Sequence, residues 1–286
     1  WMQVYMEAQE SAGKKDGSQI KIAMRILKDY AGEMVTLDQI DGDFCRGYIT
    51  YLLTEYHPKG KDISNYTLHN YYRALNGALN SAVRKKKMKA NPFNELEKSE
   101  KIRKPESMRS YMTIEEVQAL IDTPMPHEEY EIVKCAYLFS CFCGLRISDI
   151  IKLKWNDVFV DRGQYRLAVS MKKTKEPIYL PLSPEALKWM PERGGKSSED
   201  NVFDLPSANT IRMQLKPWAK AAGISKRFSY HTSRHTFATM MLTLGADLYT
   251  VSKLLGHADV KMTQVYAKII NKKKDEAVNL VNGLFH

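Results

Sequence analysis

Histidine, arginine and tyrosine side chains recur at short spacing near the C-terminal end of the chain. His231 and Arg234 lie three residues apart, His257 follows Gly256, and Tyr266 comes nine residues after His257. The arginine guanidinium presents a planar fork of donors that fits phosphate oxygens and stays charged at any working pH. Histidine carries protons near neutral pH, and an activated tyrosine can attack as a nucleophile. This set of residues predicts a site that handles a phosphate group.

The overall charge of the chain favours a polyanionic partner. The 286 residues carry a formal net charge of +10, and the isoelectric point is about 9.2. Such a balance is typical of nucleic-acid-binding proteins. The hydrophobic and charged fractions, 44% and 27%, indicate a globular protein with room for two cores. No apolar run approaches the roughly 18–20 residues of a membrane helix, so no membrane partner is expected.

Side chains alone can break a phosphodiester if they supply three functions: a nucleophile, cations for the phosphate oxygens and an acid for the leaving oxygen. Arg146 and Arg234 are the candidate cations, although 88 positions separate them and only the fold can bring them together. Asp149, one helical turn after Arg146, is placed to orient it or a neighbouring histidine. The chain has 16 tyrosines, and only its position within the motif described below favours Tyr266 as the nucleophile over its local competitors Tyr230 and Tyr249.

No metal site is expected. The chain has no acidic cluster of the kind that holds magnesium. The pair Cys141-x-Cys143 has no second pair at ligand spacing, and the four cysteines fit reduced, buried thiols. His235 follows His231 by one turn, but without a third ligand we interpret it as a structural histidine.

The chain begins at Trp1 rather than Met, so an N-terminal module could precede it.

The N-terminal part is predicted to be helical and basic. Apolar residues at helical spacing predict helices over 18–31, 41–56 and 64–89. A segment without apolar periodicity, 99–110, is interpreted as a linker that runs along DNA. Clustered lysine and arginine neutralise phosphates, although a charge run is often only a solvated face. The candidate DNA contacts here are Arg84, Lys85, Lys86, Lys87, Lys89, Lys101, Arg103 and Lys104.

The C-terminal part is predicted to combine helices with a small sheet. Short runs with strand character fill 157–182, and Asp161-Arg162-Gly163 is typical of a hairpin turn. Helices are expected over 113–122, 128–143, 147–153, 184–190, 207–222, 231–244, 247–255 and 259–268. The fold class is therefore mainly α with a small antiparallel β-sheet, in a helical domain followed by a mixed α/β domain.

Several motifs together resemble one protein family. They are His231-x-x-Arg234-His235, Leu254-Leu255-Gly256-His257 with Tyr266, Gly144-Leu145-Arg146-Ile147-Ser148-Asp149, and Lys172-Lys173-Thr174-Lys175 before Tyr179-Leu180-Pro181-Leu182. In this order they resemble the tyrosine site-specific recombinases, the lambda-integrase type of phage and transposon integrases. The resemblance is close over 111–270 and looser over the rest. Any one motif alone would be weak evidence of the family.

The resemblance implies a mechanism and a role for each residue. Tyr266 would attack DNA to form a 3′-phosphotyrosyl link, which the freed 5′-hydroxyl of another strand resolves without metal, ATP or cofactor. The implied catalytic residues are Arg146, Lys173, His231, Arg234, His257 and Tyr266, with Asp149 in support. Lys173 is the implied general acid; Lys172 and Lys175 are close enough to replace it, and all three could instead contact DNA nonspecifically.

The resemblance also implies an organisation. Residues 1–104 would form a helical, SAM-like core-binding domain and 105–286 the catalytic domain, the two closing around a double-stranded recombination site. Four copies would assemble on DNA, and apolar residues in the tail 271–286 could dock on a neighbouring subunit or on their own domain. The expected location is the bacterial cytoplasm, in association with the nucleoid.

Some alternatives stay open at the level of sequence. A type IB topoisomerase shares the phosphotyrosine chemistry but rejoins the same strand, and the apolar tail argues against it. A DNA-binding relative without activity is a second alternative, and the complete set of catalytic residue types argues against that. Chromosome-dimer resolution, phage integration and transposon integration all remain candidates, with integration or excision of a mobile element preferred because the N-terminal domain resembles those of Bacteroides-type elements.

Overall fold

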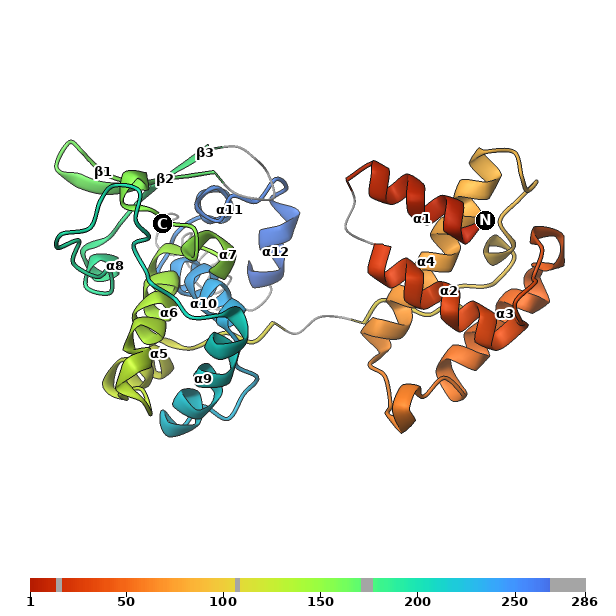
Figure 1. Cartoon of the computed structure of the whole chain (residues 1–286), viewed down its shortest axis with the longest axis horizontal. Helices are drawn as coiled ribbons and strands as arrows, with labels where there is room; N and C mark the ends of the chain where they lie inside the picture. The colour runs from red at the N-terminus through yellow and green to blue at the C-terminus, as the bar shows by residue number, and fades with distance from the viewer. Residues whose placement is uncertain (14–16, 106–108, 171–176, 268–286) are drawn as a thin grey trace, which may run out of the picture. The chain divides into compact units, whose positions relative to one another are not determined.

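The computed structural model describes residues 1–13, 17–105, 109–170 and 177–267. The chain divides into two compact units, Trp1–Ser107 and Met108–His286 (Figure 1). Helices dominate both units, and the strands of the described residues form one small sheet in the second. The fold class expected from the sequence is confirmed.

The N-terminal unit is a bundle of amphipathic helices around one apolar core. Its core includes fully buried residues of three helices, such as Ile26, Tyr48 and Leu75. The helices are α1 (Met2–Ser11), α2 (Gly17–Ala31), α3 (Gly42–Thr54) and α4 (Asn65–Arg84). Short 3₁₀ turns lie at Leu37–Gln39, Pro58–Gly60 and Pro92–Asn94. Helix α1 was not predicted from the sequence.

Side-chain caps determine where two of these helices begin. Asp41 Oδ1 accepts a hydrogen bond from the backbone N–H of Phe44, and Ser64 Oγ accepts one from Thr67. Each cap pairs a backbone donor that has no partner within the helix. The helix starts predicted at these two places are therefore right to within a residue or two.

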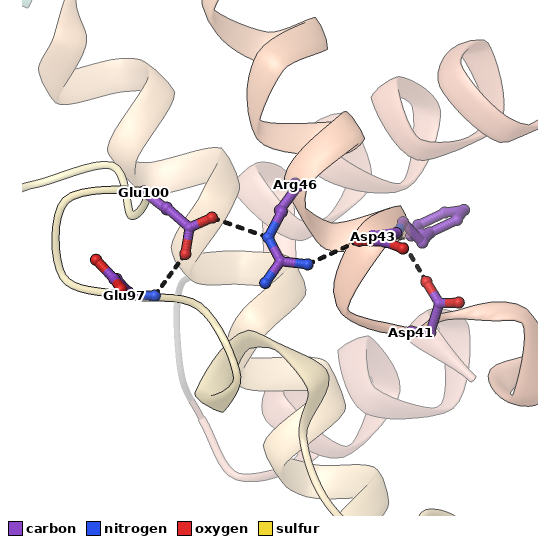
Figure 2. A network of polar contacts seen from close by, with 6 residues as sticks. Asp41, Asp43, Arg46, Glu97 and Glu100 are labelled. Atoms are coloured by element: carbon purple, nitrogen blue, oxygen red, sulfur yellow. Dashed lines mark hydrogen bonds and ion pairs between the residues drawn. The ribbon is translucent and has the colours of Figure 1, made fainter.

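An ion-pair network attaches the end of the N-terminal unit to its bundle (Figure 2). Arg46 donates from Nη1 to Asp43 Oδ1 at 2.7 Å and from Nε to Glu100 Oε1 at 2.8 Å. The side chain of Ile102 is buried in the same core as the helices. The expected linker 99–110 is therefore wrong at its start, because polar and apolar contacts hold residues up to Ile102 against the bundle.

The C-terminal unit surrounds helix α6, which is buried on nearly every side. Its other helices are α5 (Ile114–Asp122), α7 (Ile147–Ile150), α8 (Pro184–Leu187), α9 (Ala208–Ala221), α10 (Tyr230–Thr243), α11 (Leu248–Leu254) and α12 (Lys261–Ala267), with α6 at Glu131–Cys143 and 3₁₀ turns at Glu128–Tyr130 and Trp155–Asp157. Figure 1 shows α10 beside α6 and α12, which are its main packing partners.

The sheet of this unit is antiparallel, in the order β1-β2-β3. Its strands are β1 (Val158–Asp161), β2 (Gln164–Ser170) and β3 (Pro177–Pro181). The β1–β2 turn places Arg162 and Gly163 at φ of 51° and 77°. Positive φ at both central residues matches the twist of a tight hairpin. The hairpin predicted at Asp161-Arg162-Gly163 is confirmed.

Candidate active site

The first turns of α10 supply three of the candidate site residues. Thr232 Oγ1 accepts a hydrogen bond from the backbone N–H of Ser229 at 2.9 Å and so closes the start of the helix. His231 and Arg234 are three positions apart and therefore share a face. Arg234 and His235 are 2% and 8% exposed. Helix α10 thus carries a guanidinium and an imidazole into the interior of the unit.

Arg234 is anchored by two backbone carbonyls from other helices. Its Nη1 donates to the carbonyl oxygen of Gly144 at 2.7 Å, and its Nη2 donates to that of Leu255 at 2.5 Å. Burial and the nearby charge of Arg146 lower the pKa of Arg234 to about 10. The guanidinium stays charged at neutral pH and is held in one orientation by the ends of α6 and α11.

Gly144 allows α6 and α10 to approach each other closely. Its φ is +75°, in the left-handed region. A Cβ built on Gly144 would lie 2.5 Å from Cδ1 of Phe237. The absence of a side chain therefore brings the Gly144 carbonyl within reach of Arg234.

Arg146 lies in the turn between α6 and α7, beside Asp149. Its Nη1 is 3.9 Å from Asp149 Oδ2, and its backbone N–H donates to the same oxygen at 3.4 Å. The Asp149 side chain is buried, whereas that of Arg146 is 21% exposed. Burial is the main cause of the lowered pKa of Arg234, and the charge of Arg146 lowers it further, so the two guanidinium groups lie near each other.

Tyr266, on α12, faces the buried side of α10. Its side chain is 1% exposed. The phenol oxygen accepts a hydrogen bond from Arg109 Nη1 at 3.0 Å and lies 2.6 Å from His235 Nδ1. The Arg109 guanidinium also lies over the Tyr266 ring, 5.4 Å from its centroid. The candidate nucleophile therefore belongs to the same cluster as Arg234 and His235.

Arg109 was not identified from the sequence, and His235 was interpreted as structural only. Arg109 lies 157 positions from Tyr266, in a segment without periodicity, so no local pattern indicated the contact. A signal did exist for His235, because its position one turn after His231 places both rings on one side of α10. Their centroids are 4.5 Å apart, edge to face.

The two competing tyrosines lie elsewhere. Tyr230 donates from its hydroxyl to the carbonyl of Ala136 at 2.6 Å, and burial raises its pKa well above the ordinary value. Tyr249 is 60% exposed on α11, with the Lys253 ammonium over its ring. Neither phenol shares the hydrogen bonds of Tyr266, which favours Tyr266 as the nucleophile.

The two remaining histidines border the cluster. Neighbouring protein atoms remove solvent from His231 and lower its pKa, and the charges of Arg234 and Arg109 lower it further. His257 follows Gly256, whose φ of 60° ends the α11 region. Its Nδ1 lies 2.7 Å from Thr263 Oγ1, which ties the loop to α12. Burial is the largest cause of the lowered pKa of His235, and His257 is among the nearby groups that lower it further.

The remaining predicted residues either lie outside the described residues or belong to the N-terminal unit. Lys172, Lys173 and Lys175, as well as the tail 271–286, lie outside the described residues. Ser170 and Pro177, which flank the three lysines, pair across β2 and β3. Of the basic residues proposed in the N-terminal unit, Lys101 is half-buried and the others are exposed: Arg84, Lys85, Lys86, Lys87, Lys89, Arg103 and Lys104.

The described residues contain no group of three or more histidine, cysteine, aspartate or glutamate side chains placed to hold a metal ion. They also contain no helix with the length and apolar character that crossing a bilayer requires.

The sequence of the chain matches known protein families, and these matches agree with a site made of cations and a buried phenol. Residues 110–273 match the Phage integrase family, and residues 1–104 match the Phage integrase SAM-like domain. The chain belongs to the phage integrase family. This confirms the resemblance to the tyrosine recombinases and the enzyme class that it implies.

Curated relatives of this recombinase are similar over different lengths. A tyrosine recombinase of Pseudothermotoga lettingae is 29% identical over 77% of this chain and 82% of its own. The tyrosine recombinase XerD of Vibrio vulnificus is 32% identical over 59% of each chain. The recombinase thus spans 46–62% of the length of such XerD relatives.

Solved structures share the fold. A Tn1549 transposon integrase in complex with transposon right end DNA superposes with a TM-score of 0.71 and 18% identity, over 100% of this recombinase and 99% of that chain. A lambda integrase dimer bound to a core site gives 0.68 and 21% identity, over 93% of each chain. The fold of the recombinase is therefore that of the integrases.

Proposed function

We propose that this recombinase cuts and rejoins DNA strands at a specific site through a 3′-phosphotyrosyl link on Tyr266, in the integration or excision of a mobile element. The observation that carries the proposal is the cluster itself. The buried phenol of Tyr266 shares hydrogen bonds or charge with Arg109, Arg234 and His235 from distant segments. Family membership supplies the reaction class.

The proposed roles follow from the chemistry of each group. Arg146 and Arg234 hold the non-bridging oxygens of the phosphate and stabilise the charge that builds up on them. Asp149 orients Arg146, at 3.9 Å. His231 and His257 donate to the phosphate or carry protons. These groups make a phenol with an ordinary pKa of roughly 10 reactive near neutral pH.

Lys173 is the proposed acid that protonates the leaving 5′-oxygen, with Lys172 and Lys175 as neighbours that can replace it. A lysine on a four-carbon stem has the reach for this task. The reaction needs no metal or ATP, because the phosphotyrosyl link conserves the energy of the broken bond.

The proposed partner is a double-stranded recombination site, bound through the basic residues of the N-terminal domain, 1–104, and by the catalytic domain, 105–286. The net charge of +10 supports a DNA partner. Strand exchange between two sites requires several subunits, and we propose a tetramer joined through the tail 271–286. Such a protein acts in the bacterial cytoplasm, at the nucleoid. The mobile-element role draws on the likeness of the N-terminal domain to integrases of such elements.

Covalent trapping tests the proposed function. The full chain is incubated in EDTA with nicked DNA that carries its attachment site, so that the short fragment with the freed 5′-hydroxyl diffuses away and the link accumulates. We expect a protein–DNA adduct on a denaturing gel, absent in Tyr266→Phe. An adduct that survives in Tyr266→Phe contradicts the choice of nucleophile, and tight binding without any adduct favours a relative that only binds DNA. Relaxation of supercoiled plasmid without exchange between two sites would indicate a topoisomerase.

A further inference from the structure

Arg109 and His235 are the two hydrogen-bond partners of the Tyr266 phenol oxygen. The roles proposed above do not include either side chain. We propose that they prepare the nucleophile: His235 takes the phenol proton at Nδ1, while Arg109 fixes the oxygen and stabilises its negative charge. This inference rests on the proposed function, in which Tyr266 attacks the phosphate. It adds a proton acceptor and a positioning residue to the reaction.

The direction of the hydrogen bonds follows from what each group can donate. A guanidinium has only donors, so Arg109 Nη1 donates to the phenol oxygen across 3.0 Å. The buried phenol then needs an acceptor for its own proton. His235 Nδ1, at 2.6 Å, is the other partner of that oxygen. It accepts when the imidazole is neutral and its proton is on Nε2, and we assign this tautomer from the hydrogen-bond pattern.

The surroundings of His235 keep its imidazole neutral. Burial, then His231 and the charges of Arg109, Arg234 and His257, lower the pKa of His235 to about 3. The charged groups next to these are Arg146 and the buried carboxylate of Asp149. At neutral pH, His235 therefore presents a free lone pair to the phenol oxygen of Tyr266.

The scissile phosphate itself changes how readily His235 accepts a proton. A phosphodiester held by Arg146 and Arg234 brings a negative charge among the cations that disfavour protonation of His235. The pKa of His235 then rises toward its ordinary value, because an opposite charge nearby favours the charged form. The nucleophile is thus inert while the site is empty and becomes active when DNA occupies it.

The proton and the bonds balance in both directions of the reaction. In cleavage, the O–H bond of Tyr266 breaks and its proton moves to His235 Nδ1. The phenol oxygen bonds to phosphorus, the bond from phosphorus to the 5′-oxygen breaks, and that oxygen takes a proton from the acid assigned to Lys173. In rejoining, the 5′-hydroxyl attacks, the bond from phosphorus to Tyr266 breaks, and His235 returns the proton to the phenol.

Single-turnover rates of adduct formation test the assignment. The full-length variants Arg109→Ala, Arg109→Lys and His235→Gln are compared with wild type on the nicked DNA, from neutral to alkaline pH. We expect Arg109→Ala and His235→Gln to lose about 100-fold at neutral pH, the scale of general-base assistance. The loss shrinks as the pH rises, since the phenol then ionises without help. Arg109→Lys keeps part of the rate, and DNA affinity is unchanged.

A chemically altered nucleophile separates proton transfer from a structural effect. Each variant is also prepared with a fluorinated tyrosine at position 266, whose phenol ionises at lower pH. We expect this change to restore the variants more than it accelerates the wild type. Arg193→Ala is the matched control, because Arg193 is exposed and its Nε donates to the backbone carbonyl of Lys196 in the same unit. It is expected to react like the wild type.

Several results would overturn the inference. A loss that is independent of pH and is not relieved by the fluorinated tyrosine would assign Arg109 and His235 a structural role. A faster reaction of Arg109→Ala would mean that the contact restrains Tyr266 instead of assisting it. Both outcomes leave the proposed function standing. The lack of an adduct from the wild type, or an adduct in Tyr266→Phe, overturns the proposed function and this assignment together.

Discussion

The two arginines of the site differ in what they contribute to the folded state. The fork of Arg234 pairs two buried carbonyls, whereas Arg146 is partly exposed. A lysine at position 234 pairs at most one of them well and leaves an acceptor unsatisfied. We expect Arg234→Lys to lower the free energy of unfolding by about 1–3 kcal/mol and to abolish adduct formation.

Arg146→Lys is the matched variant. It should lose the adduct as well, because a lysine cannot bind phosphate through two parallel bonds, but with a change in stability within about 0.5 kcal/mol. Urea denaturation and the trapping gel measure the two quantities. Equal stability losses in both variants would contradict the difference in burial.

The low pKa of His235 predicts a dependence of stability on pH. Its folded-state pKa of about 3 lies below that of the unfolded chain. The unfolded state therefore binds the extra proton, and stability falls as the pH drops from about 6.5 toward 3, by at most about 1.4 kcal/mol per pH unit. His231 shifts in the same direction.

Urea denaturation across this pH range, with wild type and His235→Gln side by side, isolates the contribution of His235. Carboxylates that destabilise both proteins in acid cancel in the difference. The variant should lose less stability than the wild type between these pH values. Parallel curves would show that His235 does not titrate with a lowered pKa in the folded state.

At the scale of elements, the approach of α6 to α10 depends on Gly144. Alanine there must adopt a φ of +75° and meets the Phe237 ring. The positive φ lowers the free energy of unfolding by about 1–2 kcal/mol, and overpacking against Phe237 lowers it by about 1–3 kcal/mol. We expect Gly144→Ala to be less stable by about 2–5 kcal/mol and to form adduct slowly, because the carbonyl that holds Arg234 moves.

Gly163→Ala is the control for the backbone effect. Gly163 has a φ of +77°, and nothing lies within 4 Å of the added Cβ. Only the conformational cost, about 1–2 kcal/mol, is expected in urea denaturation. If the two alanine variants were equally stable, the contact with Phe237 would not contribute.

The sequence predicts elements better than it predicts the contacts between them. Periodicity and caps predict both ends of α10 to within one residue. The motifs of the family resemblance identify Arg234 and Tyr266 as site residues. Helix α1 was missed because its apolar stripe is weak, with Met2 and Met6 as its buried residues. Arg109 could not be predicted, because its contact with Tyr266 exists only once α12 has packed on α10.

At the scale of the whole molecule, the basic residues at the end of α4 are expected to supply affinity without specificity. Lys85, Lys86, Lys87 and Lys89 are exposed. Their replacement by alanine should weaken binding to target and unrelated DNA by the same factor. It should also reduce the slope of log affinity against log salt, by about 0.9 for each lost phosphate contact.

Lysines that already have an acidic partner provide the control. Lys154, Lys188 and Lys196 pair with Glu199, Glu185 and Asp204 at 2.6–2.7 Å. Replacing these three by alanine also removes positive charge, but from ammonium groups that are already neutralised locally. Titration of the full chain with labelled DNA at several salt concentrations measures both sets. Equal changes in slope would mean that net charge alone attracts DNA, whereas a loss confined to the target sequence would mean that the four lysines after α4 read bases.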